Sequence, residues 1–125
     1  MAQHNILGNA GEQYAYEFLI KEGFIVRERN WKLNHLEIDI IAEKNGVFHF
    51  VEVKTRSQKT HFDPRRSINY QKQRNLINAS RAYCKMYHRM DVGIQYDVII
   101  IYGTPGGFSI EYMPGYFRMP TRTYR

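Results

Sequence analysis

Two carboxylates and one lysine lie in a short stretch of the chain where β-strands would normally carry apolar side chains. Asp39 belongs to the run LEIDIIA, and Glu52 and Lys54 belong to the run FVEVKTR. Paired carboxylates can hold Mg²⁺, which prefers oxygen ligands and keeps several of its waters. A metal-bound water is a nucleophile near neutral pH, and a lysine beside it can stabilise charge on an attacked phosphate. These residue types therefore predict a site for phosphodiester hydrolysis.

A β-hairpin would position these side chains. β-branched residues recur along both runs with a period of two, which indicates extended structure. The Asn-Gly pair at 45–46 predicts a type I′ turn, because both turn positions need positive φ. Counting outward from the turn pairs Asp39 with Glu52 and Glu37 with Lys54, and places all four side chains on one face. Facing carboxylates repel each other, so we expect a cation between them; the alternative is a solvated salt-bridge cluster that adds little stability.

The hairpin also resembles the D…ExK signature of the PD-(D/E)XK nucleases, with Asp39 as the first acid and Glu52-Val53-Lys54 as the second motif. More narrowly, GEQYAYEFLIKEGFIVRERNW, LEIDIIA and FVEVKTR are similar to segments of the YraN-like family of small bacterial proteins. The resemblance covers roughly residues 8–102. Family members are regarded as endonucleases, similar in fold to archaeal Holliday-junction resolvases. Leu36 and Asp63 depart from the family pattern, which usually has glycine at both positions.

The resemblance implies a role for each motif residue. Asp39, Glu52 and the main-chain carbonyl of Val53 would bind Mg²⁺ or Mn²⁺, and Lys54 would orient or deprotonate the attacking water. The implied activity is a metal-dependent endonuclease acting on DNA, with branched or damaged DNA as candidate substrates. Two alternatives stay open: a nucleic-acid-binding module with weak or no catalysis on the same scaffold, and a protein-interaction domain whose charges are incidental.

Further residues are candidates for the same site. Glu12 matches an additional acid of the family and would complete the metal shell, although an acid near a helix N-terminus is also favoured by the helix dipole. Glu37 is an accessory candidate that could equally pair with Lys54. Lys72, on a predicted helix, would reach the scissile phosphate or snorkel to solvent, and Gln71 is a weaker accessory candidate. Residues that could follow a phosphate backbone, or form a plain solvated basic face, are Arg56, Lys59, Arg65, Arg66 and Arg74.

Composition favours a polyanionic partner. The 125 residues include 18 basic and 12 acidic side chains, which gives a net charge of +6 and points to nucleic acid, with DNA preferred through the resemblance. Cys84 is the only cysteine, which excludes an internal disulfide and fits a reducing cytoplasm. The sequence predicts no signal peptide, membrane span or membrane partner. A homodimer is expected by analogy with the resolvases alone.

The order of predicted elements gives the fold class. Periodicity alone supports an α/β or α+β domain without choosing its topology. The resemblance implies an α/β fold with a restriction-endonuclease-like αβββαβ core, in which helices flank a mixed central sheet. We expect one domain over 1–112 and a basic, aromatic tail over 113–125. In chain order the expected elements are a helix over 8–22, a strand over 24–30, the hairpin of 35–56, a helix over 67–90, and strands over 95–102 and 108–112.

One acidic residue is predicted to be structural. Asp97 lies in the apolar strand QYDVIIIY, where a buried charge needs a partner such as an arginine or a backbone donor. His49 lies on the opposite strand face from the acidic cluster and is expected to be a satisfied core or surface residue. Neither residue is expected to take part in catalysis.

Overall fold

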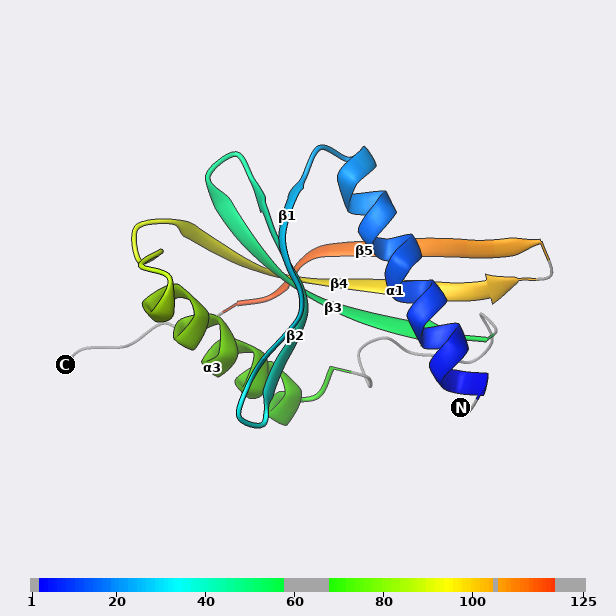
Figure 1. The fold of residues 1–125 in the computed structure, drawn as a ribbon, viewed down its shortest axis with the longest axis horizontal. Helices are drawn as coiled ribbons and strands as arrows, with labels where there is room; N and C mark the ends of the chain where they lie inside the picture. The colour runs from blue at the N-terminus through cyan, green and yellow to red at the C-terminus, as the bar shows by residue number, and fades with distance from the viewer. Residues whose placement is uncertain (1–2, 58–67, 105, 119–125) are drawn as a thin grey trace.

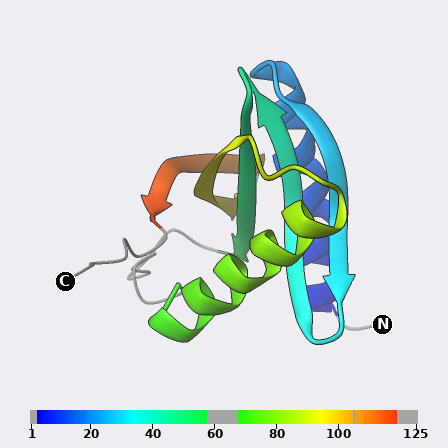
Figure 2. The same cartoon turned by 90° about the vertical axis from the view of Figure 1, so that its left-hand side faces the viewer.

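The chain folds into a five-stranded mixed sheet with a helix on each face, as predicted (Figures 1 and 2). The computed structural model describes residues 3–57, 68–104 and 106–118. The spatial order of the described strands is β1-β2-β3-β4-β5. Among these strands only the pair β3 and β4 is parallel, and α3 lies between them in the chain. The elements are α1 (Gln3–Lys21), β1 (Ile25–Leu33), β2 (Leu36–Lys44), β3 (Val47–Arg56), α3 (Tyr70–Met86), β4 (Gly93–Thr104) and β5 (Gly107–Phe117).

The two helices cover two separate apolar cores. On one face, Ala15 and Leu19 of α1 pack against Val51 and other aliphatic side chains of β2, β3 and β4. On the other face, α3 packs through Leu76 and Tyr83 against aromatic side chains of β3 and β4. Burial on both faces explains why β3 and β4 are nearly continuous apolar runs. A charged side chain within these strands therefore requires a specific explanation.

The central hairpin forms around the predicted turn. Asn45 and Gly46 have φ values of 53° and 78°, as a type I′ turn requires. The register counted from the turn is confirmed through the pair of Ile41 with Phe50 and as far as Ile40. The last pair between β2 and β3 is Ile40 with Val51.

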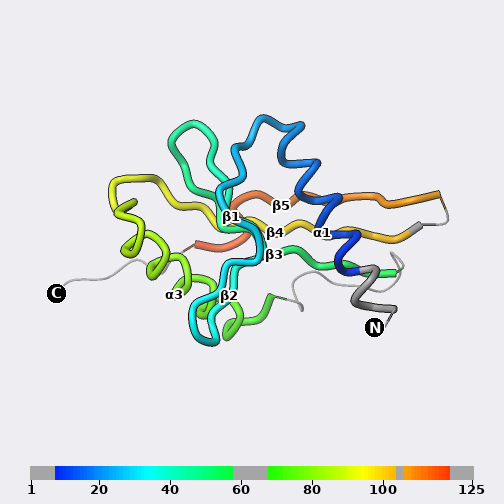
Figure 3. The backbone as a smooth tube through the Cα atoms, in the orientation of Figure 1, coloured from blue at the N-terminus to red at the C-terminus, as the bar shows by residue number. Residues whose placement is uncertain are grey.

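The predicted pairs beyond that point are wrong. Asp39 does not pair with Glu52 through the backbone, and Glu37 does not pair with Lys54, because β2 parts from β3 and continues only beside β1. The turn between β1 and β2 lies beside α3, as the tube in Figure 3 shows. The parted strands create the place where the candidate site lies.

Several element boundaries differ from the prediction. α1 begins at Gln3 and so extends further toward the N-terminus than expected. Asn69 caps α3, since its side chain accepts a hydrogen bond from the Lys72 N–H at 2.9 Å, and the helix ends at Met86. β5 runs to Phe117, so residues 113–117 belong to a strand and not to the expected tail. Within the residues that the structure describes, no helix combines the length and the apolar character needed to cross a membrane.

Candidate active site

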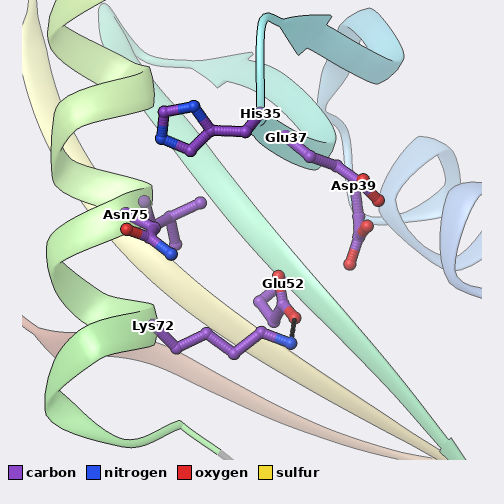
Figure 4. A pocket seen from close by; sticks show the side chains of 7 residues that line it. His35, Glu37, Asp39, Glu52, Lys72 and Asn75 are labelled. Carbon is purple, nitrogen blue, oxygen red and sulfur yellow. Dashed lines mark ion pairs between the residues drawn. The ribbon is translucent and has the colours of Figure 1, made fainter.

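A pocket of about 220 Å³ opens where β2 parts from β3 (Figure 4). It lies on the α3 side of the sheet, and its walls come from the β1–β2 turn, β2, β3 and α3. Most of its lining is polar, in contrast to the apolar cores on either face of the sheet. The lining residues are His35, Glu37, Asp39, Glu52, Lys72, Asn75 and Leu76.

Asp39 lies at the point where the two strands part. Its Oδ2 accepts a hydrogen bond of 2.8 Å from the Val53 N–H, so the side chain takes the place of a backbone partner for β3. Burial, with the adjacent Glu52 carboxylate as the next cause, raises the pKa of Asp39 to about 8. Glu12 and Glu37 act in the same direction, and only the Val53 hydrogen bond opposes them. This carboxyl therefore lies in an excess of negative charge that a bound cation would relieve.

The Glu52 carboxylate forms ion pairs with two lysines. Its residue is 9% exposed, and its Oε2 lies 3.0 Å from Nζ of Lys54 and 3.1 Å from Nζ of Lys72. Burial and the neighbouring Lys72 lower the pKa of Lys54, despite its contact with Glu52. The pKa of Lys72 is raised, because its contacts with Lys54 and Glu52 outweigh the lowering effect of burial. Of the two lysines, Lys54 is therefore the better proton acceptor.

Glu12 reaches the same cluster from the opposite side of the sheet. Its Oε1 is buried, and none of the described residues supplies a hydrogen-bond partner for it. Burial raises its pKa, and Glu37 and Glu52 add to the rise while Arg29 opposes it. The helix-dipole alternative is wrong, because α1 begins at Gln3 and Glu12 lies in its middle. A buried carboxylate oxygen without such a partner is costly, so a cation or a water bound to it would stabilise the site.

Close packing of α1 on β3 brings Glu12 to this position. A Cβ atom at Gly11 would clash with Oγ1 of Thr55 and would lie 3.0 Å from its Cγ2 and 3.3 Å from its Cβ. No rotation of Thr55 relieves all three contacts, so only glycine allows this approach. The next residue after Gly11 is Glu12, whose position in the cluster therefore depends on the glycine.

The accessory role of Glu37 stays a prediction, but the alternative that it pairs with Lys54 is wrong. Glu37 is exposed and lines the pocket, but Lys54 pairs with Glu52 and not with Glu37. Glu37 acts on the site through its charge, since it raises the pKa of both Asp39 and Glu12.

The donor set fits a hydrated hard cation. Among the described residues, no three His, Cys, Asp or Glu side chains stand close enough to hold an ion on their own. Mg²⁺ does not require such a cage, because it typically binds one or two carboxylates and keeps several waters. Among the described residues, Oε1 of Glu12 has no hydrogen-bond partner, and a cation would give it a ligand contact. The same cation would stabilise the ionised form of Asp39, whose pKa is raised.

Of the residues predicted to contact nucleic acid, one lines the pocket, others lie elsewhere in the described part of the chain, and three lie outside it. Lys72 is in the pocket, whereas Arg74 lies about 200° around α3 from it and places its guanidinium 6.0 Å from the ring centre of Tyr70. Gln71 donates a hydrogen bond to Asn75 at 3.0 Å and thereby supports the pocket wall. Arg56, at the end of β3, donates to the Thr55 carbonyl. The candidates that lie outside the described residues are Lys59, Arg65 and Arg66.

Two pocket residues, His35 and Asn75, belong to none of the sequence motifs. Asn75 lies one helical turn after Lys72, and this i, i+3 spacing was the signal that could have identified it. His35 follows Asn34, whose φ of 56° marks a tight turn, but no motif connects this histidine to the acidic residues. Only the folding of the β1–β2 turn toward α3 brings His35 to the pocket.

Asp97 is structural, as predicted. It is fully buried, and its Oδ2 contacts His49 Nδ1 and the Tyr112 hydroxyl, each at 2.7 Å. Gln95 Nε2 and the Gly115 N–H donate to Oδ1, each at 2.9 Å. Burial alone would raise the pKa of Asp97, but these hydrogen bonds outweigh it and lower the pKa. His49 is likewise a satisfied core residue, 8% exposed.

Comparison with known proteins gives a consistent family match. The model of the family described as "Uncharacterised protein family UPF0102" matches residues 11–101. A UPF0102 protein of Bacteroides fragilis is 39% identical over 120 residues, which cover 96% of this chain and 98% of that protein. A UPF0102 protein of Bacteroides thetaiotaomicron is 38% identical with the same coverage, and one of Myxococcus xanthus is 35% identical over 93% of this chain and 92% of its own length.

Proposed function

This chain belongs to the UPF0102 family, the YraN-like family that its motifs resemble, and on this basis we propose that it is a metal-dependent endonuclease acting on DNA. One observation carries the proposal: Asp39, whose pKa is raised by burial and by Glu52, lines an open pocket together with Glu52, and Glu52 contacts Lys54, whose pKa is lowered. Ordinary folding does not favour this combination, because unpaired buried charge is destabilising. It is the arrangement that metal-assisted hydrolysis of a phosphodiester needs.

The proposed metal is Mg²⁺ or Mn²⁺. Asp39 and Glu52 would bind it together with the main-chain carbonyl of Val53, and Glu12 would bind it directly or through water. When bound, the ion would supply an activated water and neutralise charge on the attacked phosphate. Asp39 would be deprotonated in that state, so its raised pKa makes metal binding depend on pH.

The lysines would act on the nucleophile and on the substrate. Lys54, two residues beyond Glu52 on β3, would orient the attacking water and accept its proton, since its pKa is lowered by burial and by Lys72. Lys72 faces the open pocket with its side chain 44% exposed, so it would contact a phosphate oxygen. Asn75 and His35 would form the wall along which the nucleic acid lies.

Cleavage assays test this proposal. Labelled four-way-junction, flap and linear DNA would be incubated with Mg²⁺ or Mn²⁺ and the native protein, Lys54→Ala or Lys85→Ala, all purified identically. Lys85 is an exposed lysine in the last turn of α3 and is the matched control. Cleavage by the native protein and Lys85→Ala, but not by Lys54→Ala, is the expected result. Equal cleavage by all three would indicate a contaminant.

The same assay addresses the alternative function. Binding of these DNAs without cleavage under either metal would favour a nucleic-acid-binding module on the nuclease scaffold. A homodimer, proposed from the resolvase resemblance, would place one active site on each of two DNA strands. Sedimentation analysis of the protein with and without junction DNA tests that part of the proposal.

A further inference from the structure

Lys72 ends on a carboxylate that the proposed metal would also use. Its Nζ and that of Lys54 contact the same oxygen, Oε2 of Glu52, at 3.1 and 3.0 Å. One carboxylate oxygen is thus shared by two ammonium groups. A cation that binds Glu52 must compete with at least one of these lysines for the negative charge.

The ammonium groups of Lys54 and Lys72 differ in how readily they can move away from Glu52. Lys54 lies on the same strand as Glu52, and its side chain is only 17% exposed, so its release would leave a charge poorly solvated. Lys72 comes from α3, and its side chain is 44% exposed. A lysine has a flexible four-carbon stem, so its ammonium can move into solvent without a change in the helix. Lys72 is therefore the contact that a metal can displace.

We propose that Lys72 occupies Glu52 only in the metal-free state, and that metal binding frees its ammonium to bind the phosphate of the nucleic acid. This inference rests on the proposed endonuclease function. A freed Lys72 remains in the pocket wall beside Asn75, opposite the β1–β2 turn, and so faces the space that substrate would enter (Figure 4).

Coupling between the two ligands follows from this exchange. Without metal, a phosphate must draw Lys72 away from Glu52, and without nucleic acid, the metal must do so alone. Each ligand removes a cost that the other would otherwise meet, so metal and nucleic acid bind cooperatively. The lysine thereby keeps the site from binding a nucleic acid firmly before the metal is present.

Metal affinity is the measurement that separates this role from simple phosphate binding. Mn²⁺ would be titrated calorimetrically into the native protein, Lys72→Met and Lys85→Met at one pH and salt concentration, without nucleic acid. Loss of a competitor of the strength of a partly exposed ion pair should tighten Mn²⁺ binding by Lys72→Met about fivefold, or about 1 kcal/mol. Lys85→Met removes the same charge from the exposed end of the same helix and should bind Mn²⁺ as the native protein does.

DNA binding supplies the second readout. Ca²⁺ has the same preference for oxygen ligands and would be used with a labelled DNA duplex, whose fluorescence anisotropy reports affinity. Ca²⁺ should tighten DNA binding by the native protein and by Lys85→Met. In Lys72→Met most of this Ca²⁺-dependent gain in DNA affinity should be lost.

The outcomes distinguish this inference from the proposed function. If the native protein binds Mn²⁺ and Lys72→Met binds it equally or more weakly, Lys72 does not compete for Glu52, and the inference is wrong while the endonuclease proposal stands. If the native protein binds no Mn²⁺, the proposed function fails and the inference fails with it. Unfolding curves followed through Trp31 would establish that all variants are folded before either titration.

Discussion

Replacing Asp39 with asparagine should stabilise the metal-free protein as the pH rises. The only hydrogen bond that the described residues donate to Asp39 comes from the Val53 N–H, at 2.8 Å, whereas Glu52, Glu12 and Glu37 all add negative charge around it. Asparagine keeps an acceptor for the Val53 N–H and removes the charge. The substitution therefore separates the structural hydrogen bond from the electrostatic cost of the site.

The pKa shift gives the magnitude and its sign. Burial and Glu52 raise the pKa of Asp39 from 3.8 to about 8, so between these values the folded protein keeps a proton that the unfolded chain releases. The stabilising effect of this proton is complete below the unfolded pKa and is lost as the pH rises through the folded pKa. One proton corresponds to ~1.4 kcal/mol per pH unit. From about pH 5 to about pH 8, the native protein should lose up to about 4 kcal/mol relative to Asp39→Asn.

Urea unfolding in the presence of a chelator measures this difference. Trp31 is the only tryptophan, is 8% exposed and lies edge-on to Tyr83 at 5.4 Å, so its fluorescence reports the core on the α3 side. Asp97→Asn is the control, because Asp97 is also buried but accepts four hydrogen bonds and has a lowered pKa. Because the pKa of Asp97 is lowered, the stability that its carboxylate contributes is lost only at acid pH. Asp97→Asn should therefore be less stable than the native protein by a constant ~2–3 kcal/mol from about pH 5 to about pH 8.

A flat difference between native protein and Asp39→Asn from about pH 5 to about pH 8 would refute the assignment of unbalanced charge to this pocket. Addition of Mg²⁺ at the alkaline end supplies a further check. The native protein should gain stability through ligand linkage, and Asp39→Asn should not. Equal stabilisation of both proteins would place the metal elsewhere.

Three further results are expected. Gly11→Ala should weaken Mn²⁺ binding and destabilise the fold by about 1–3 kcal/mol, because the new Cβ forces α1 away from Thr55. Adding Thr55→Ala in the same chain should restore much of the Mn²⁺ affinity and of the stability, and no recovery would refute the packing argument. Mn²⁺ binding should release protons below about pH 8 and tighten with rising pH, which calorimetry in buffers of different ionisation enthalpy measures. Leu76→Ala should cost about 3 kcal/mol in urea unfolding, because Leu76 is 4% exposed and packs beneath the pocket.

The hairpin and its acidic residues could be predicted because their signals are local. The type I′ turn at 45–46 depends on two neighbouring residues, and the strand period fixes which side chains share a face over a few positions. The register therefore held as far as Ile40, and Asp39, Glu52 and Lys54 were correctly assigned to one neighbourhood. The buried structural role of Asp97 followed similarly, from one charge in an apolar run.

Contacts between distant elements were decided by packing. Backbone pairing was extrapolated to Asp39 and Glu52, but β2 leaves β3 after Ile40, and a side chain accepts the Val53 N–H in place of a carbonyl. His35 enters the pocket because the β1–β2 turn folds toward α3. Neither event has a periodic signal, since each depends on the shape of the whole core.

The sequence by itself determined the residue types, the hairpin and the chemistry that they favour. Only the tertiary structure decided that Glu12 reaches the cluster through the Gly11–Thr55 contact, and that Lys72 shares one oxygen of Glu52 with Lys54. Periodicity specifies the direction of a side chain relative to its own backbone. Distances between side chains on different elements, and therefore pKa values and ion pairs, follow from how helices and sheet pack together.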